Sequence, residues 1–306
     1  MTLTGVPADG PAEIPSLSSG DRAVGPLRRV ASELWRRRLA RVSGAVLLMM
    51  IVIAVLAPLV APDDPEAQDL GDSLASPSWA HPLATDQLGR DILSRLIFGA
   101  RLSLGAAAIA VAVATLLGVL PGLVAGYLGG WVEAVVMRIT DALMSFPPLI
   151  LALAITGVLG PGLGNAMTAV GVVFAPRFVR LTRASVIDIR EADFVHAARS
   201  IGVAERAILG RHVLPNALGP LVVQVTVTAG FAMLAEASLS FLGLGVQPPE
   251  ASWGSMIGEA ARLISRTKLL VIWPGLAITV TVLALGFLGD SLRQALGLEQ
   301  GSGDDA

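Results

Sequence analysis

The chain has 306 residues, of which 54% are hydrophobic and only 15% are charged, and its mean hydropathy is +0.70. Soluble domains contain roughly 25% charged residues, so this composition excludes an ordinary water-soluble domain and indicates a membrane protein. A formal net charge of −2 argues against a nucleic-acid partner, which would require a clustered basic excess. The absence of cysteine excludes a disulfide framework, an iron–sulfur cluster and a thiolate metal site.

The sequence also lacks the motifs of common enzyme classes. Its one lysine, Lys268, is not part of a phosphate-binding loop G-x-x-x-x-G-K-[ST], so we do not expect the chain itself to hydrolyse ATP. Its histidines, His81, His196 and His212, are far apart in sequence and form no H-E-x-x-H zinc motif. No serine stands in a G-x-S-x-G nucleophile elbow. We therefore expect no catalytic residue, metal site or cofactor on this chain.

Long uncharged windows predict the membrane spans. A helix needs about 20 residues to cross about 30 Å of hydrocarbon, so four of the windows fit one helix each. The window 142–176 is ambiguous, because its 35 residues would make either one overlong helix or two short ones. The windows are 42–62, 102–132, 142–176, 213–235 and 269–289.

Clusters of arginine resolve this ambiguity. Arg36, Arg37, Arg38 and Arg41 precede the first window, and seven arginines lie in the segment 177–212. The positive-inside rule puts both clusters in the cytoplasm, so an even number of crossings must separate them. The window 142–176 must then supply two helices, with a glycine-rich turn near its middle, at 160–164. The prediction is an all-α membrane protein with six transmembrane helices and both termini in the cytoplasm.

The segments outside the core follow from this topology. The first 34 residues contain too few periodic apolar residues to fold, which predicts a disordered tail. A cleaved signal peptide is the alternative for the first apolar run, but that run is about 20 residues long and such peptides have only 7–15. The expected divisions are a cytoplasmic tail (1–34), a first transmembrane helix (35–62), an extracytoplasmic segment (63–100), a five-helix core (101–297) and a cytoplasmic tail (298–306).

Two features of these segments allow more than one interpretation. Thr85 and Asp86 can cap an amphipathic helix that either lies on the membrane surface or leads into the second span. Glu236, near the outer end of the fifth helix, could meet the amino terminus of a passing peptide or hold an external gate closed. The alternative for Glu236 is a carboxylate that reaches interfacial water.

Small residues recur at a regular spacing in and just after the second span. Gly118, Gly122, Gly126 and Gly130 follow one another at intervals of four residues. This spacing puts them on one side of a helix, where they would allow another helix to approach closely. We expect them to serve helix packing, and pore lining is the alternative.

A segment between the fourth and fifth spans predicts an elbow of two short helices. The spacing of apolar residues indicates a first helix with one apolar face, which Asp193 can cap and which Gly202 can end in a left-handed turn. A second short helix then leads back to the membrane. A loop without a partner would not explain why apolar side chains are exposed there. The residues of the apolar face are Phe194, Val195, Ala198 and Ile201.

The elbow resembles the EAA loop of permease subunits of binding-protein-dependent ABC importers, within a segment at 188–216. His196 stands where the family has its glutamate and His212 where an isoleucine is usual, departures that resemble the dipeptide and oligopeptide branch. Two further stretches, at 81–95 and 239–249, are similar to DppC/OppC-type subunits. The elbow positions that match the family pattern are Ala197, Ala198, Gly202, Leu214 and Pro215.

The resemblance, which covers about residues 40–297, implies a type I ABC importer permease fold with a cytoplasmic coupling-helix elbow. It implies a multi-pass protein of the bacterial cytoplasmic (inner) membrane that translocates dipeptides or oligopeptides. Its partners would be membrane lipid, a paralogous DppB/OppB-type permease subunit, an extracytoplasmic substrate-binding protein and two ATPase subunits that bind ATP and Mg. A permease for nickel chelates or another small solute is the alternative, with a secondary transporter or an intramembrane enzyme more remote.

Overall fold

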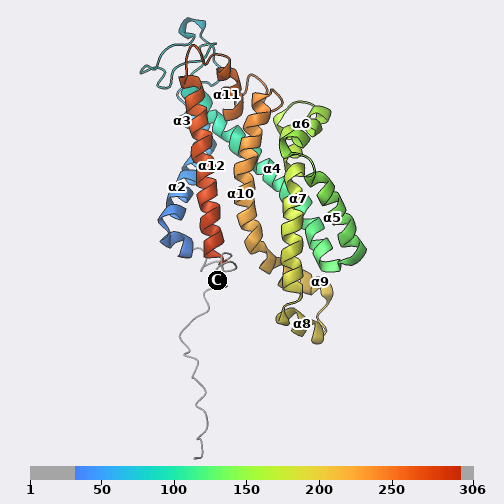
Figure 1. Ribbon diagram of the computed structural model, residues 1–306. Coiled ribbons are helices and arrows are strands. Elements are labelled where there is room, and N and C mark those ends of the chain that lie inside the picture. The colour runs from blue at the N-terminus through green and yellow to red at the C-terminus, as the bar shows by residue number, and fades with distance from the viewer. Residues whose placement is uncertain (1–31, 298–306) are drawn as a thin grey trace, which may run out of the picture.

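The computed structural model describes residues 32–297, which form helices and connecting loops without a strand (Figure 1). Most of the expected N-terminal tail and the whole expected C-terminal tail lie outside the described residues. The molecule has two ends. The elbow end carries α8 and α9, and the opposite end carries the long segment between α3 and α4 (Figure 1).

The helices follow one another with short connections, except for that one long segment. They are α2 (Arg38–Val55), α3 (Ala57–Val60), the 3₁₀ turn η1 (Leu70–Asp72), α4 (Ile92–Leu128), α5 (Gly130–Met144), α6 (Pro148–Leu159), α7 (Leu163–Arg190), α8 (Asp193–Ser200), α9 (Glu205–Ile208), the π-helical turn η2 (Leu209–Val213), α10 (Leu214–Phe241), α11 (Trp253–Ala261) and α12 (Leu269–Ala295).

Within residues 32–297, four helical units are long and apolar enough to cross a membrane: α2, α4, the continuous run from α9 to α10, and α12. The pair α5 and α6 adds a fifth if it is one broken span, since the two helices meet at 94°. The helix α7 stands between α4, α5 and α10, and it would complete the expected six (Figure 1). Its first half carries no charge, whereas its second half is rich in arginine, so length and composition alone do not establish it as a span.

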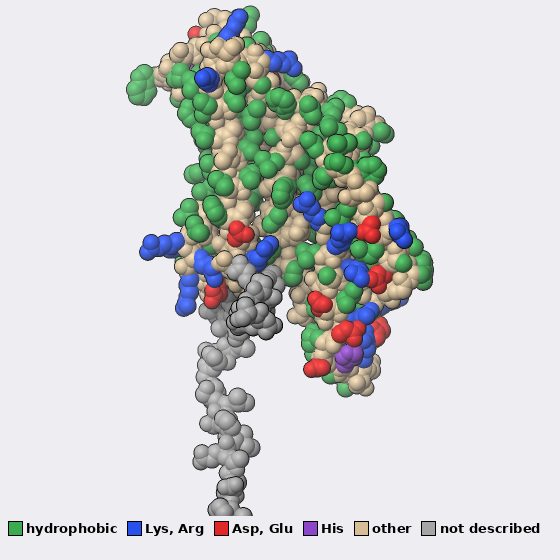
Figure 2. All heavy atoms as spheres, in the orientation of Figure 1, with side chains coloured by type: hydrophobic (Ala, Val, Ile, Leu, Met, Phe, Trp, Pro, Cys, Tyr) green, Lys and Arg blue, Asp and Glu red, His purple; other side chains and the backbone are tan. Residues whose placement is uncertain are grey.

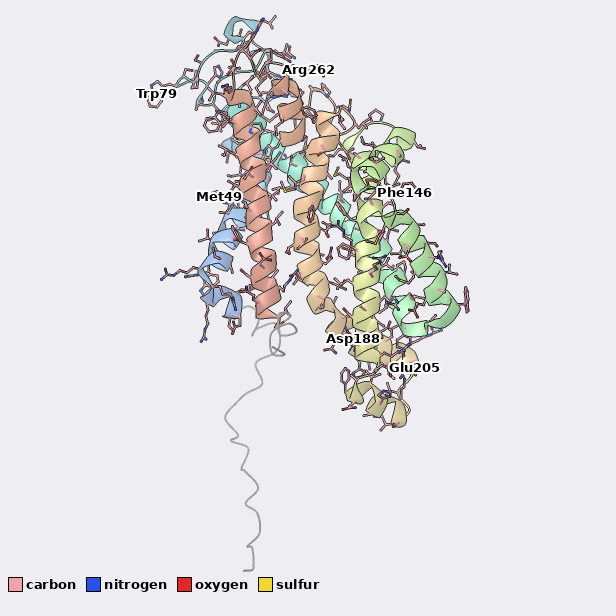
Figure 3. All side chains as sticks on the ribbon, in the orientation of Figure 1. Met49, Trp79, Phe146, Asp188, Glu205 and Arg262 are labelled. Atoms are coloured by element: carbon pink, nitrogen blue, oxygen red, sulfur yellow. The ribbon has the colours of Figure 1, made fainter. Side chains whose placement is uncertain are left out.

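The window 142–176 folds differently from the expectation in one respect. The turn lies where it was expected, with Gly160 and Gly162 at φ 89° and 133°. The helix before it, however, begins at Gly130 and breaks sharply after Met144, near Phe146 (Figure 3). The cause is the pair Pro147-Pro148, because proline lacks a backbone N–H and disfavours the α conformation in the residue before it.

The start of α4 also corrects an expectation. Thr85 and Asp86 do not cap a helix, since α4 begins at Ile92 and the side chain of Asp91 accepts a hydrogen bond from the Ser94 N–H at 2.7 Å. Asp86 instead organises the preceding turn by accepting from the N–H of Arg90 at 3.0 Å. The helix runs without interruption into the second span, so the interpretation as a helix that leads into the membrane is the correct one.

Three of these four glycines lie in α4 and bring it against α7, whereas Gly130 begins α5. A Cβ atom placed on Gly118 would lie 2.3 Å from the Cβ of Phe178, and one on Gly122 would lie 2.7 Å from the carbonyl oxygen of Val179. A Cβ on Gly126 would lie 2.8 Å from the carbonyl oxygen of Arg183. This geometry is consistent with the prediction that these glycines serve helix packing. Gly130 does not share it, because nothing lies within 4 Å of its Cβ position.

Candidate functional site

The elbow projects beyond the ends of α7 and α10 (Figure 1). It consists of α8, a reversal at Gly202 and α9, which continues through η2 into α10. Gly202 has φ +80°, the left-handed conformation expected from the sequence. Asp193 lies in the first turn of α8 but makes no capping hydrogen bond, so it acts at most through its charge near the helix N-terminus.

The expected apolar face of α8 is divided between the chain itself and its surface. Val195 is 0% exposed and Ala198 is 8% exposed, because both pack in a small cluster with Val186 of α7, Ile208 and Val213. Phe194 and Ile201 remain 47% and 81% exposed. The prediction that all four residues form a docking face is therefore wrong for Val195 and Ala198.

The other residues of the elbow pattern lie at different depths. Ala197 and Gly202 are exposed, so they share the accessible surface of the elbow with Phe194. Leu214 and Pro215 are the first residues of α10, where Leu214 is partly buried and Pro215 is exposed. Proline is well suited to the first turn of a helix, where its missing N–H has no helical partner. The residues of the family pattern therefore have different positions: some lie on the surface of the elbow, Gly202 reverses the chain, and Leu214 and Pro215 begin α10.

The carboxylate of Glu205 links the two helices of the elbow to α4, a role that the sequence did not predict. Glu205 of α9 accepts hydrogen bonds from Arg199 of α8, at 3.0 Å to Nε, and from the hydroxyl of Tyr127 at the end of α4. Arg190 donates to the carbonyl oxygen of Tyr127 at 3.2 Å. Figure 3 shows Glu205 at the base of the helices, where the elbow meets them. The elbow is therefore joined to α4 as well as to α7 and α10.

At the opposite end, buried ion pairs join the long segment to α11. Arg90 and Arg95 are 3% and 1% exposed, and each donates to the same oxygen of Glu259, at 2.8 and 3.2 Å. Asp86 pairs with Nε of Arg90 at 2.5 Å. A buried arginine is tolerated only when its charge is paired, so this network fixes the segment against α11.

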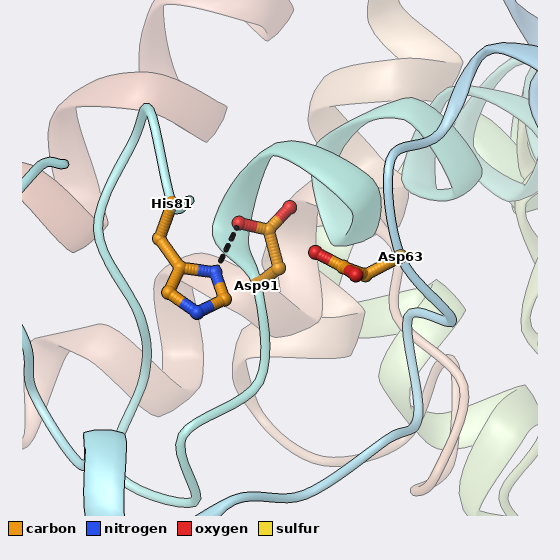
Figure 4. A group of neighbouring side chains, drawn as sticks. All are labelled: Asp63, His81 and Asp91. Carbon is orange, nitrogen blue, oxygen red and sulfur yellow. Dashed lines mark hydrogen bonds and ion pairs between the residues drawn. The ribbon is translucent and has the colours of Figure 1, made fainter. Parts of the chain in front are cut away.

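His81 lies beside carboxylates in the same region, and Figure 4 shows Asp91 between its imidazole and Asp63. Its Nδ1 is 3.1 Å from Asp91, and its Nε2 is 3.7 Å from Asp72. Asp63, His81 and Asp91 bring potential ligand atoms within 4.8 Å of one another. Asp91 already caps α4 and pairs with the imidazole, so this cluster is explained as a structural contact that joins the long segment to the start of α4. We call Asp63, His81 and Asp91 the clasp.

A cavity of about 970 Å³ opens beside this clasp, between α3, the first turns of α4 and the loop before α11. A volume of this size is typical of pockets for small solutes. Apolar side chains such as Phe98 and Leu102 form part of its wall. The charged residues of its lining are Asp63, Asp64, Glu66, Arg95, Arg101 and Glu250.

Glu236 lies inside the chain. It is 1% exposed, and it accepts a hydrogen bond from Ser240 Oγ at 2.7 Å and a longer one from Ser103 Oγ at 3.5 Å. Ser103 in turn accepts from the backbone N–H of Trp253 at 3.1 Å. These contacts join α10, α4 and α11. The alternative in which Glu236 reaches interfacial water does not fit this burial, and contact with a solute would require the helices around it to separate.

Comparison with known proteins identifies the family. Residues 118–298 match the family model of the binding-protein-dependent transport system inner membrane component, and residues 25–77 match that of the N-terminal TM domain of oligopeptide transport permease C. The chain belongs to this family of ABC importer permeases. The resemblance stated from the elbow sequence is thereby confirmed, and the protein is a multi-pass transport subunit of the inner membrane.

Individual relatives agree with this family. The chain is 40% identical to the dipeptide transport system permease protein DppC of Alkalihalophilus pseudofirmus over 274 residues, 90% of each chain. It is 44% identical to the glutathione transport system permease protein GsiD of Shigella flexneri over 269 residues, covering 86% of this chain and 89% of that protein. The inward-facing MetNI methionine ABC transporter matches with a TM-score of 0.54 at 21% identity, over 67% of this chain and 96% of that chain, which shows the fold alone.

Proposed function

We propose that this protein is the membrane permease subunit of an ABC importer for dipeptides or oligopeptides, driven by ATPases on separate chains. The observation that carries this proposal is the elbow. It exposes apolar Phe194 and Ile201 outside the bundle while Val195 and Ala198 fix it on the chain's own core. Exposed apolar side chains on a rigid support are typical of a surface that another protein covers.

The contacts of the elbow explain how it would transmit motion. Phe194, Ala197 and Ile201 contact an ATPase subunit, and a displacement of that subunit carries α8 with it. Because Val195 and Ala198 pack against Val186, α8 cannot move without α7. The hydrogen bond between Tyr127 and Glu205 passes the same displacement to α4. ATP binding to the partner ATPases would thus tilt the packed pair α4 and α7 together.

Gly202, Leu214 and Pro215 have supporting roles in this proposal. Gly202 reverses the chain so that α8 and α9 form one unit, and Leu214 and Pro215 begin the span that follows. The elbow end faces the cytoplasm, together with both chain termini. The arginines at the start of α2 lie at this end as well, which agrees with the positive-inside rule.

The remaining subunits are those that the family requires. They are a paralogous DppB/OppB-type permease subunit, two ATPase subunits that hold ATP and Mg, and an extracytoplasmic substrate-binding protein that delivers the solute to the opposite end. The cavity beside α3 opens at that end and carries charges of both signs, as suits a zwitterionic peptide. The identity to dipeptide and glutathione permeases supports peptides as the cargo.

A reconstituted complex tests this proposal. The permease would be purified with its neighbouring subunits, placed in lipid vesicles, and supplied with ATP, the binding protein and a radiolabelled dipeptide. We expect peptide-stimulated ATP hydrolysis and uptake that both require the binding protein. Stimulation by a nickel chelate but not by any peptide would contradict the proposed cargo. Uptake that continues without ATP would contradict the proposed transport class.

A further inference from the structure

The four arginines of α7 are not equivalent. Arg180 pairs with Asp141 of α5 at 2.6 Å, Arg183 donates to Glu133 of α5 at 2.7 Å from Nε, and Arg190 lies 3.0 Å from Glu191. Arg177 has no carboxylate partner among the residues that the structure describes. The contacts of its guanidinium group are therefore of another kind.

Two aromatic rings hold the guanidinium of Arg177. Its central carbon lies 5.3 Å from the ring centroid of Phe174 and 5.3 Å from that of Phe231. The rings belong to α7 and α10, and their centroids are 6.4 Å apart. Guanidinium groups that stack on aromatic rings are attracted through their faces, which leaves the N–H groups at the edge available for hydrogen bonds. No hydrogen bond from this guanidinium to another described residue is present.

In the proposed six-span topology, Arg177 lies within the apolar layer, towards the elbow end of α7. Residues 163–176 of α7 carry no charge, so Arg177 is the first charged residue met from the opposite end. It stands 14 residues from the start of the helix, or about 21 Å along it at 1.5 Å per residue. Its side chain is only partly buried. An arginine at such depth is costly against lipid and is therefore expected to face a protein interior or a water-filled path.

These observations distinguish Arg177 from the arginines whose charges only set the orientation of the protein in the membrane. Arg180 and Arg183 pair with carboxylates of α5, whereas Arg177 lies against one ring of its own helix and one ring of α10. A planar guanidinium in a fixed orientation matches a carboxylate, to which it can donate two parallel hydrogen bonds. The site would thus select an anionic group on a molecule that reaches the exposed edge of this guanidinium.

We propose that Arg177 binds the carboxylate of the transported solute during translocation, with Phe174 and Phe231 as its positioning residues. The inference rests on the proposed peptide importer, because the C-terminal carboxylate is a group that every linear peptide carries whatever its side chains. Recognition of this group explains how one path accepts peptides of different sequence. It also assigns a role to a residue that charge counting alone puts in a cytoplasmic loop.

The test compares a dipeptide with its C-terminal amide in the reconstituted importer. Uptake of each would be measured at a concentration that saturates the binding protein, whose affinity for both solutes is determined separately. We expect Arg177→Gln to lower the rate for the dipeptide by about tenfold and to leave the rate for the amide unchanged. Arg177→Lys keeps the charge but loses the planar edge, so it should recover only part of the rate.

Arg180→Gln is the matched control, since it removes a charge from the next turn of the same helix that already has a partner. This variant should change the rates for dipeptide and amide by the same factor. An equal loss for both solutes in Arg177→Gln, with normal co-purification of the ATPase, would assign Arg177 to packing or to a contact with the paralogous permease and would overturn the inference. Absence of any dipeptide uptake by the unmodified complex would instead contradict the proposed function itself.

Discussion

The hydroxyl of Tyr127, the single tyrosine of the chain, donates a hydrogen bond to the carboxylate of Glu205, 78 residues further along. Tyr127 lies in the last turn of α4, and Glu205 is the first residue of α9. The bond therefore connects α4 to the elbow. It gives the elbow a connection to α4 that does not run through α7.

Tyr127→Phe is expected to weaken coupling without loss of the fold. The variant keeps the ring and removes only the hydroxyl, and a hydrogen bond to a charged acceptor contributes about 1.5–3 kcal/mol. Uptake per ATP hydrolysed should fall several-fold while ATPase co-purification stays normal. Glu205→Gln keeps an acceptor for the hydroxyl and should have a smaller effect. Equal uptake per ATP in Tyr127→Phe and in the unmodified protein would show that α4 receives its motion through α7 alone.

Gly202→Val is expected to abolish uptake through the backbone. Nothing lies within 4 Å of the Cβ position of Gly202, so the added side chain meets no obstacle. The cost arises from φ +80°, which a β-branched residue adopts only with a strain of about 1–3 kcal/mol. The strain would change the direction of α8 relative to α9, while the transmembrane helices would still fold. Uptake and ATPase co-purification in vesicles measure the effect.

Gly202→Asn is the matched control for this prediction. Asparagine tolerates the left-handed conformation better than other residues, so it should keep most of the uptake. Solute capture by the separate binding protein should be normal in both variants. Equal uptake for valine, asparagine and glycine at this position would mean that the direction of α8 does not matter for coupling.

The elbow was predictable from sequence because its signals are local. A polar start at Asp193, helical spacing of apolar residues and a glycine at the end together define α8 within a residue or two. The direction in which each apolar residue faces was not predictable. Val195 and Ile201 are equally apolar, and only the position of α7 and η2 decides that one is buried and the other exposed.

Charge counting gave a useful topology but a wrong boundary. The fourth helix was expected to extend past its uncharged window to about Arg180, whereas α7 continues to Arg190. Asp141 and Glu133 of α5 pair with Arg180 and Arg183 along this extension. Such pairs join residues far apart in sequence, so no local pattern reveals them. The break before α6 was different, since Pro147-Pro148 is a local sequence signal for a helix break, although the uncharged window continues across it.

Ile201→Ser is expected to weaken ATPase binding without disturbing the permease. Its side chain is 81% exposed, so its burial by a partner would contribute up to about 1.5–3 kcal/mol to the complex and nothing to the free fold. Co-purification of the ATPase should fall, and thermal unfolding of the isolated permease should not change. A lower unfolding temperature with normal ATPase binding would contradict the docking role.

Ala198→Arg is expected to act by another route. Ala198 is only 8% exposed, so an arginine there would push α8 away from Val186 and Ile208 rather than enter a partner's surface. Proteolysis at the elbow should then increase even in the absence of the ATPase. Resistance to protease equal to that of the unmodified protein would mean that the contact with α7 is looser than the structure indicates.

Gly122→Val is expected to destabilise the pair α4 and α7. A Cβ at this position would lie 2.7 Å from the carbonyl oxygen of Val179 and 2.8 Å from the Cβ of Thr182, so the two helices must separate. Overpacking of this kind costs about 1–3 kcal/mol or more. Gly105→Val in the same helix is the matched control, because nothing lies within 4 Å of that Cβ position. Thermal unfolding in detergent should show a loss for the first variant only.

Single cysteines test the orientation of the two ends. The chain contains no cysteine, so Ser76→Cys and Ser200→Cys each introduce one reactive thiol on an exposed residue. Ser255 is unsuitable as a second outer site, since it is 8% exposed and belongs to the cap of α11. In intact cells an impermeant thiol reagent should label Ser76→Cys and not Ser200→Cys, and inverted membrane vesicles should give the reverse. Labelling of Ser200→Cys from outside would place the elbow on the wrong side for an ATPase and contradict the coupling role of α8.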